Sequence, residues 1–268
     1  METSLVRYDK LRPLLKWAGG KRWLIPHLRP IWEPHSTRRL VEPLCGGLAI
    51  TFGLQPRKAL LNDINPHLIN FYQQVKMGLK VEITMENNKS LYYRQRERFN
   101  QLIREKRWDT SEAAQLFYYL NHTDYNGLCR FNDSGLFNVP FGKYRQINYV
   151  RDFGSYADAF SDWKFTRGDF SKVKVEADDF VYVDPPYDVE FRQYSAGGFS
   201  WDDQVRLADW AADLGVPTVI SNQATDRILK LYRSRGFSLK PIDVPRFINC
   251  VGTKRGPVTE VVGTKGAS

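Results

Sequence analysis

The tetrapeptide Asp184-Pro185-Pro186-Tyr187 has the residue types of a site that handles an amino group. It follows the apolar run 180–183 (FVYV), and because two prolines cannot continue a central strand, the chain must leave the sheet there. The Asp184 carboxylate and the Pro185 carbonyl can accept the two hydrogens of an exocyclic amino group, and Tyr187 can stack on the base that carries it. We predict that this tetrapeptide is catalytic. A proline-rich turn with a packing tyrosine is the simpler alternative.

A glycine turn forms the second candidate site. Gly46 and Gly47 follow a predicted strand at 39–44 (RLVEPL) and precede a helical pattern, and such a turn lets a ligand approach the backbone closely. Asp63 ends the next predicted strand, 58–61 (KALL), where a carboxylate can bind ribose hydroxyls. The pair fits any nucleoside-containing cofactor. Taken alone, the two glycines favour a structural turn, because such turns are common.

A third candidate is the segment 16–21 (KWAGGK), in which two glycines between Trp17 and Lys21 predict a loop over a ligand. It lacks the GxxxxGK[ST] spacing, so we do not predict an ATPase. The cysteines and histidines form no CxxC or HExxH pattern, so we expect neither a disulfide scaffold nor a metal site. The cysteines are Cys45, Cys129 and Cys250.

The elements that must position these residues alternate between short apolar strands and helical patterns. Besides the strands above, strands are predicted at 180–183, 217–220 and 258–262. Ser200 and Asp203 form a capping-box pattern, followed by a helical stripe of Val205, Ala208 and Ala212. Together these patterns predict an α/β fold with a mostly parallel, doubly wound sheet.

The middle of the chain differs from both ends. Leu91, Phe99, Leu102 and Ile103 lie at helical spacing among many arginines, and a second helix is predicted at 111–121. The polar, aromatic segment 124–146 follows, with a turn signal at 133–135 that predicts a hairpin. We therefore expect a catalytic domain made of 1–70 and 153–268, interrupted by a small helical insert with a basic hairpin at 71–152.

Composition describes a folded chain with a basic surface. The 268 residues are 42% hydrophobic and 26% charged, which excludes a disordered or low-complexity protein. No apolar run is long enough to span a membrane and the first residues lack a secretory pattern, so we expect a cytoplasmic protein. The net charge of +9 (39 − 30) and 14% aromatic residues suit a nucleic-acid partner, although a basic solvated surface would look the same.

With these motifs, the chain resembles a known family, the Dam-like DNA adenine-N6 methyltransferases with the alpha order of motifs. KWAGGK at 16–21 is similar to the N-terminal cofactor motif, VEPLCGG at 41–47 to the glycine loop and NDIN at 62–65 to the acidic motif. DPPY at 184–187 is similar to the catalytic motif. NGLCRFN at 126–132 and FNVPFGKY at 137–144 look like its target-recognition segment. The likeness covers nearly the whole chain, and this set of motifs in this order is specific.

The resemblance implies a Rossmann-like fold and S-adenosylmethionine as the cofactor. The cofactor-binding positions that it implies are Trp17, Lys21, Gly46, Gly47, Asp63, Asp169 and Asp184. It also implies double-stranded DNA as the partner, with GATC-type recognition, Tyr125 wedged beside a flipped base and no obligate protein partner. The other DNA-binding positions are Lys16, Asn126, Leu128, Arg130, Pro140 and Tyr144.

Two departures from the family pattern lie in the glycine loop. Leu44 replaces the usual phenylalanine, and Leu48 stands where many members have glycine. Arg130 makes independent sense, because a guanidinium group can bind guanine O6 and N7 together. The alternative is that Arg130 and Tyr144 are solvated hairpin residues.

The function we predict is transfer of a methyl group from S-adenosylmethionine to N6 of a flipped-out adenine in duplex DNA, in a bacterium or a phage. The enzyme alternatives are RNA adenine and protein glutamine methyltransferases, which use a similar N/DPPY site, and the segment 126–132 argues against both. A catalytically silent DNA-binding protein is the alternative from another class. A dinucleotide-dependent oxidoreductase would leave the tetrapeptide 184–187 without a role.

Overall fold

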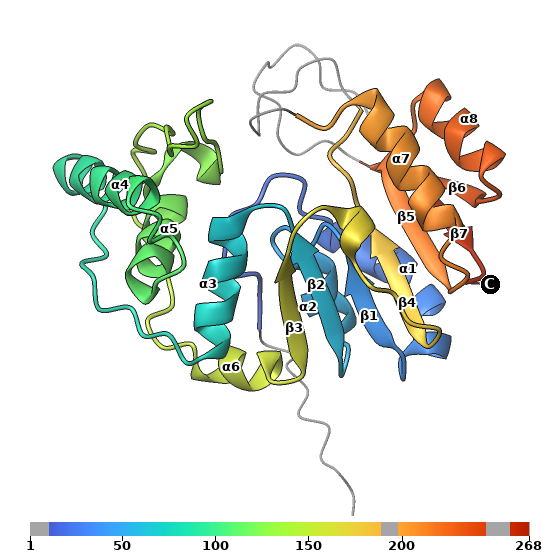
Figure 1. The fold of residues 1–268 in the computed structure, drawn as a ribbon, viewed down its shortest axis with the longest axis horizontal. Helices are drawn as coiled ribbons and strands as arrows, with labels where there is room; N and C mark the ends of the chain where they lie inside the picture. Colours follow the sequence, from blue (N-terminus) through green and yellow to red (C-terminus); the bar gives the residue numbers. More distant parts are fainter. Residues whose placement is uncertain (1–10, 189–197, 245–257, 268) are drawn as a thin grey trace, which may run out of the picture.

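The structure is a computed structural model that describes residues 11–188, 198–244 and 258–267. Within these residues the centre is a sheet of seven strands in the order β3-β2-β1-β4-β5-β7-β6 (Figure 1). Its strands are β1 (Arg39–Glu42), β2 (Ala59–Asp63), β3 (Trp163–Arg167), β4 (Asp179–Val183), β5 (Thr218–Gln223), β6 (Ser238–Val244) and β7 (Val258–Lys265). Strands β1 to β5 pair in parallel, whereas β7 is antiparallel to both β5 and β6. The prediction of a mostly parallel sheet is confirmed.

The strands that sequence patterns predicted correspond to β1, β2, β4, β5 and β7. The two that were missed, β3 and β6, are the outermost strands of the described sheet. In β3, buried Trp163 and Phe165 alternate with more polar residues, and β6 contains Pro241, which central strands exclude. Edge strands need fewer apolar residues, so neither segment stands out as an apolar run.

Helices cover both faces of the sheet (Figure 1). The helices are α1 (Ile25–Trp32), α2 (Ala49–Leu54), α3 (Pro66–Lys76), α4 (Lys89–Arg104), α5 (Ser111–Thr123), α6 (Gly154–Phe160), α7 (Trp201–Ala212) and α8 (Asp226–Ser234). Alternate strand residues face opposite sides: Leu40 and Phe180 pack in the core with α1 and α2, and Val41 and Val181 in the core with α7 and α8. Because both faces of the sheet are buried, the central strands carry apolar residues on both faces.

The capping box at the start of α7 is confirmed. The Asp203 amide donates to Ser200 Oγ at 3.1 Å, and the Ser200 amide donates to Asp203 Oδ2 at 2.9 Å. The buried face of the helix carries Gln204, Leu207, Ala208 and Ala211. Of the predicted stripe, Val205 and Ala212 are only partly buried. The prediction of a helix after β4 is therefore correct, with its buried face turned by one position.

The middle of the chain forms α4, α5 and a hairpin, which lie together on one side of the molecule beside α3 (Figure 1). The predicted turn is present, because the Gly135 amide donates to the Asn132 carbonyl at 2.8 Å. Only isolated bridges, Asp124 to Phe141 and Phe131 to Phe137, pair the two arms, so the arms are not regular strands. Asn100 of α4 holds the hairpin by exchanging two hydrogen bonds with the backbone of Phe137, at 2.8 and 3.0 Å.

The helical region and the sheet share one hydrophobic core. Phe71 of α3 stacks on Tyr118 of α5 with the ring centroids 5.2 Å apart, and His67 of α3 stacks on Phe131 of the hairpin at 4.9 Å. The border expected at residue 71 falls inside α3, which contacts both regions. Every helix in the described ranges is too short or too polar to cross a bilayer.

Candidate active site

Asp184 follows β4 directly, at the carboxyl end of the strand. The strand order reverses between β1 and β4, and ligands bind at such a point in open α/β sheets. Its Oδ1 accepts a hydrogen bond from Ser221 Oγ at 2.9 Å and lies 3.1 Å from the ammonium nitrogen of Lys21. Among the described residues, no donor is assigned to Oδ2, and the side chain is 21% exposed. One carboxylate oxygen is therefore fixed by the protein, and the other is available to a ligand.

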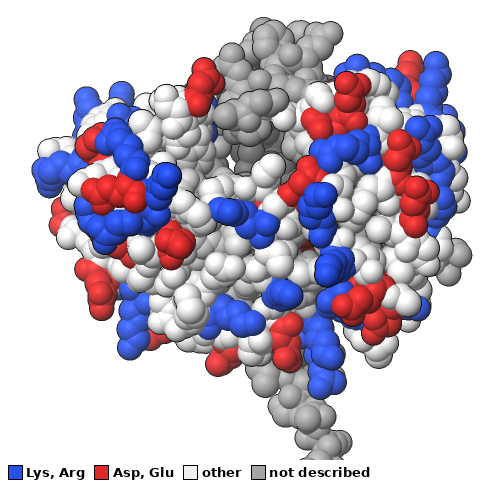
Figure 2. Space-filling model, viewed as in Figure 1, with Lys and Arg blue, Asp and Glu red and all other residues white. Residues whose placement is uncertain are grey.

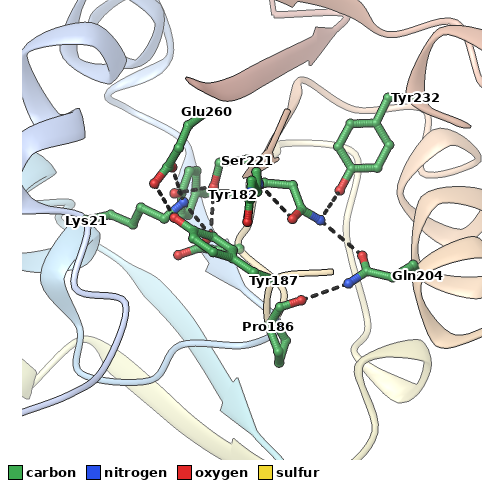
Figure 3. Close-up of polar contacts among 11 residues, drawn as sticks. Lys21, Tyr182, Pro186, Tyr187, Gln204, Ser221, Tyr232 and Glu260 are labelled. Atoms are coloured by element: carbon green, nitrogen blue, oxygen red, sulfur yellow. Dashed lines mark hydrogen bonds and ion pairs between the residues drawn. The ribbon is translucent and has the colours of Figure 1, made fainter. Parts of the chain in front are cut away.

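Lys21 is the centre of this cluster. Its side chain is 2% exposed, and its Nζ donates to Glu260 Oε2 at 2.7 Å. The same Glu260 accepts a hydrogen bond from the hydroxyl of Tyr187 through Oε1, and the ammonium group lies 4.7 Å from the centroid of the Tyr187 ring (Figure 3). Glu260 therefore joins the N-terminal loop to the tetrapeptide 184–187.

Burial and charge set the ionisation of the cluster. Burial raises the pKa of Asp184 above its usual value, although Lys21 opposes the shift. For Lys21, burial favours the neutral amine, but Asp184 and the other acidic groups around it outweigh burial and raise its pKa well above the ordinary value. Lys21 therefore stays charged at neutral pH.

The second proline points its carbonyl away from the acidic cluster. Gln204 Nε2 of α7 donates to the Pro186 carbonyl at 2.7 Å, and Asn222 Nδ2 donates to both Gln204 Oε1 and the Tyr232 hydroxyl at 3.1 Å (Figure 3). In the ranges that the structure covers, no donor is assigned to the Pro185 carbonyl. The Pro185 carbonyl and Asp184 Oδ2 are thus the acceptors left without an assigned donor among the described residues.

The glycine loop packs against Trp17. A Cβ atom at Gly46 would lie 2.7 Å from Trp17 Nε1, and one at Gly47 would lie 2.7 Å from Trp17 Cβ. The sequence analysis ascribed these glycines to the approach of a ligand. The structure shows a second reason, since the loop 16–21 lies against them. Leu48 adopts a left-handed φ of 59° and is fully buried, so it occupies a conformation that glycine would adopt without strain.

Asp63 joins the glycine loop to the next turn. Its Oδ2 accepts from the Gly46 amide at 3.1 Å and its Oδ1 from the Asn65 amide at 2.9 Å, while burial raises its pKa. Each oxygen keeps a lone pair for a further donor. The next residue, Ile64, is apolar and 66% exposed. A carboxylate with spare acceptors beside an exposed apolar side chain fits a nucleoside, with ribose hydroxyls on Asp63 and a ring against Ile64.

Asp169 is held by Arg206 of α7 through two hydrogen bonds, at 2.8 and 2.9 Å. These bonds and those from Ser171 hold the pKa of the Asp169 carboxyl well below its usual range. The side chain is therefore an ordered, ionised acceptor rather than a free one. Asp169 is one of the cofactor-binding positions that the resemblance implies, and Arg206 occupies part of its acceptor capacity.

Two of the predicted DNA-binding residues, Lys16 and Tyr144, meet each other. Lys16 Nζ lies 3.5 Å from the centroid of the Tyr144 ring and donates to the His122 carbonyl at 3.0 Å. Buried Asn121 exchanges hydrogen bonds of 2.8 Å with the backbone N–H and carbonyl of Lys16. Gly127 lets the two segments approach, because its Cβ would lie 2.2 Å from Lys16 Cβ.

Tyr125, Asn126 and Pro140 lie at the base of the hairpin. The Tyr125 ring is 49% exposed, and its amide donates to the Pro140 carbonyl at 2.8 Å. Asn126 has a left-handed φ of 59° inside the short turn η3 (Tyr125–Gly127). The neighbouring Asp124 is fully buried, and burial raises the pKa of its carboxyl to about 9, so it is protonated at neutral pH. An exposed ring on a buried, well-held backbone segment is the arrangement that a wedge between bases requires.

Arg130 and Leu128 lie further along the hairpin arm. Arg130 Nε donates to Asn138 Oδ1 of the opposite arm at 2.8 Å, so the guanidinium group is oriented and only partly buried. Leu128 packs against the main hydrophobic core. The predicted DNA-binding residues other than Lys16 therefore lie in the hairpin segment 124–146, and Lys16 contacts that segment at Tyr144.

Sequence reasoning missed Glu260, Ser221 and Asn121. Glu260 had a signal, because it is the single charged residue inside the predicted strand 258–262 (VTEVV). A carboxylate in a buried central strand needs a cationic partner, and here that partner is Lys21. Ser221 and Asn121 had no local signal, since each acts through a contact with a distant segment.

The sheet order and the acidic site at its carboxyl edge define a Rossmann-like α/β methyltransferase. More closely, the chain belongs to the D12 class N6 adenine-specific DNA methyltransferase family, whose model matches residues 17–246.

Relatives identified by sequence match this chain over nearly its full length. The chain is 36% identical over 276 residues to the type II methyltransferase M1.LlaDCHI of Lactococcus lactis subsp. cremoris, with 95% of both chains covered. It is 33% identical over 273 residues to a DNA adenine methylase of Vibrio cholerae serotype O1, with 94% of this chain and 95% of the relative covered. Among solved structures, the tRNA (m1A58) methyltransferase TrmI of Aquifex aeolicus aligns with a TM-score of 0.35 and 11% identity, over 90% of this chain and 68% of that one.

Proposed function

We propose that this enzyme transfers a methyl group from S-adenosylmethionine to N6 of an adenine that has been flipped out of duplex DNA, within a GATC site. The observation that carries the proposal is the state of Asp184: Oδ1 is bound by Ser221 and Lys21, and Oδ2 is left for a substrate amine. The Pro185 carbonyl supplies the second acceptor, and Tyr187 the stacking ring.

The chemistry at these residues is a displacement at carbon. S-adenosylmethionine supplies a methyl group on a positively charged sulfur. Hydrogen bonds from the amine to Asp184 Oδ2 and the Pro185 carbonyl localise the lone pair on N6, which then forms the new N–C bond as the C–S bond breaks. One proton leaves N6. Because burial raises the pKa of Asp184, its carboxylate accepts a proton more readily than an exposed aspartate does, and can pass it to water.

The residues that would hold the cofactor lie along the carboxyl edge of β1, β2 and β4. Asp63 offers lone pairs to ribose hydroxyls, Ile64 an apolar surface, and Asp169 an ionised acceptor for an adenine amino group. Trp17 lies against the glycine loop and closes one side. This donor set fits a nucleoside with a positively charged centre, since Asp184 and Glu260 outnumber the buried ammonium group between them.

Recognition of DNA belongs to the region 71–152 together with Lys16. Adenine in a duplex cannot reach Asp184 without leaving the base stack, so the enzyme must flip it. The exposed ring of Tyr125 can fill the space that the base leaves. Lys16, Asn126, Leu128, Arg130, Pro140 and Tyr144 line the neighbouring surface.

The test is base-resolution detection of N6-methyladenine after incubation of DNA with the purified enzyme and S-adenosylmethionine. We expect methylation of GATC adenines, loss of methylation in Asp184→Ala, and nearly unchanged duplex affinity in that variant, because phosphate contacts come from dispersed basic residues. Asp162→Ala, at an exposed position, is the matched control and should methylate as the wild type does. Methylation of RNA in preference to duplex DNA, or normal turnover by Asp184→Ala, would contradict the proposal.

A further inference from the structure

Glu260 binds two separate parts of the proposed methyl-transfer site with one carboxylate. Oε2 accepts a hydrogen bond from Lys21 at 2.7 Å, and Oε1 accepts one from the Tyr187 hydroxyl (Figure 3). The Glu260 side chain is only 9% exposed, so both bonds are shielded from competing water. Charge-assisted hydrogen bonds in such surroundings are stronger and more directional than exposed ones.

The backbone of Glu260 is held on both sides. In β7 it lies opposite Gln223 of β5 and opposite Ile242 of β6. A residue in a strand that pairs on both edges moves less than one in a loop, whereas Lys21 and Tyr187 lie outside the strands. The rigid partner in this network is therefore Glu260.

We propose that Glu260 is a positioning residue for methyl transfer: it orients the Tyr187 ring for stacking on the target base and holds Lys21 against Oδ1 of Asp184. This inference rests on the proposed function. A phenol ring held only through its Cα–Cβ bond can swing about that bond, but a hydrogen bond from its far oxygen to Glu260 holds the outer end of the ring in place. A lysine with two acidic partners cannot swing to cover Asp184 Oδ2, so that oxygen stays open to the amine.

The decisive variant is Glu260→Gln. Glutamine keeps the shape of the side chain but carries no charge, and only one of its two terminal atoms is an acceptor, so the two charge-assisted bonds from Lys21 and Tyr187 cannot both be kept. We expect the single-turnover methylation rate on a GATC duplex to fall about 10- to 100-fold, the loss of one charge-assisted hydrogen bond at the transition state, while duplex Kd changes less than threefold. An unchanged rate would overturn the proposal, and so would a loss seen entirely in duplex Kd.

A spectroscopic readout separates positioning from general stability. A duplex with 2-aminopurine in place of the target adenine becomes fluorescent when the base leaves the stack, and stacking on a tyrosine quenches that fluorescence. We expect Glu260→Gln to flip the base but leave it brighter than the wild type does, because the Tyr187 ring is no longer fixed. Equal brightness in both proteins would contradict the role assigned to Tyr187.

Tyr187→Phe tests the same link without disturbing the buried charges. It removes only the hydroxyl that donates a hydrogen bond to Glu260. We expect it to lower the rate and brighten the probe, and we expect the double variant Tyr187→Phe/Glu260→Gln to lose less than the product of the two single effects. Effects that multiply would show that Glu260 does not act through Tyr187.

Asp243→Asn is the matched control. Asp243 lies in the neighbouring strand β6, and its Oδ1 accepts a hydrogen bond from Thr259, the residue before Glu260, at 2.8 Å. Rate, brightness and thermal unfolding should match the wild type. If the wild type itself does not methylate duplex adenine, the proposed function fails. If the wild type methylates and Glu260→Gln matches it, only the present inference fails.

Discussion

Glu42, a residue in the last position of β1, is a buried carboxyl that the proposed chemistry does not use. It is 3% exposed, and its Oε1 accepts a hydrogen bond from the Thr51 hydroxyl. Burial, assisted by the charge of Asp184, raises its pKa to about 8. The folded protein therefore holds a proton at neutral pH that the unfolded chain, with an ordinary glutamate pKa, releases.

This proton makes stability depend on pH in a defined direction. Because the folded pKa is the higher one, the contribution of Glu42 is fully present below about pH 4.5 and is lost as pH rises toward about 8. In the wild type, this loss lowers the free energy of unfolding by about 1.4 kcal/mol per pH unit across that window. We expect Glu42→Gln to abolish that slope. Urea unfolding at several pH values measures it. Glu33→Gln, at an exposed position, should keep the wild-type slope, and an identical slope in Glu42→Gln would refute the assignment.

Arg130 carries the prediction on sequence preference. Asn138 orients its guanidinium group on the partly exposed hairpin arm, and an oriented guanidinium can bind guanine O6 and N7 together. We expect Arg130→Ala to lower discrimination at one base pair of the site by about 1–3 kcal/mol. Initial methylation rates on GATC and on singly substituted duplexes measure this.

Lys106→Ala is the control for Arg130. Lys106 is exposed just beyond α4 and has a left-handed φ, a conformation that alanine tolerates about as poorly as lysine does. Its loss should weaken all substrates alike. If Arg130→Ala also lowers all rates alike, Arg130 is a phosphate contact rather than a base reader.

How much of the site could be read from the sequence depends on chain distance. The tetrapeptide at Asp184 and the loop at Lys21 are local patterns, so both could be found without a structure. Glu260 lies 239 residues from Lys21, and only the antiparallel insertion of β7 between β5 and β6 brings them together. A pattern search along the chain cannot see such a contact.

At the scale of elements, the glycine turn between β1 and α2 depends on its neighbour. Gly47 faces Trp17 Cβ, an atom close to the backbone that cannot rotate away. We expect Gly47→Ala to push the loop 16–21 outward, to lower stability by about 1–3 kcal/mol, and to weaken S-adenosylmethionine binding. Thermal unfolding and calorimetric titration measure the two effects.

Gly20→Ala is the control for this turn. A Cβ there would lie 3.6 Å from the Trp17 carbonyl, an ordinary contact. It should leave stability and cofactor binding near the wild-type values. If Gly47→Ala behaves in the same way, Trp17 does not press on the loop as the structure indicates.

The fold was predictable wherever burial requires a recognisable pattern of apolar residues in the sequence. Strands β1, β4 and β5 are buried on both faces and appear as apolar runs, and the Ser200 and Asp203 capping box marks the start of α7. The strands β3 and β6 were missed because they are the outermost strands of the sheet that the structure describes, and their polar residues break up the apolar runs. The hairpin was predicted from its turn, but its arms pair only through separate backbone hydrogen bonds and isolated bridges, and Asn100 of α4 also holds them.

At the scale of the whole molecule, the turn after Asp63 and the hairpin 124–146 are in direct contact. Asn65, two residues after Asp63, donates to the Cys129 thiol sulfur at 3.3 Å, and His67 stacks on Phe131. Burial lowers the pKa of His67 to about 4, so this contact is between neutral rings at physiological pH. The cofactor contact proposed at Asp63 and the base contacts proposed for the hairpin would therefore act on one packed unit.

Positive charge, by contrast, is dispersed. Lys and Arg side chains alternate with Asp and Glu over the face shown in Figure 2, and three arginines from α4 and the turn after it pair with glutamates, at 2.6 to 3.3 Å. These are Arg98 with Glu112, Arg104 with Glu97, and Arg107 with Glu105. Paired arginines must give up a partner before they bind a phosphate, so fewer cations are available than the composition suggests.

The net charge of +9 nevertheless predicts that DNA affinity falls with salt. Each neutralised phosphate releases a counterion and adds about −0.9 to the slope of log affinity against log salt. We expect a loss of at least about tenfold between 50 and 200 mM salt, which corresponds to roughly two phosphate contacts. Fluorescence anisotropy with a labelled GATC duplex measures the slope, and Arg130→Ala should keep most of it if Arg130 reads a base. A flat plot would mean that dispersed phosphate contacts do not hold the DNA, and that affinity comes instead from base stacking and the hairpin.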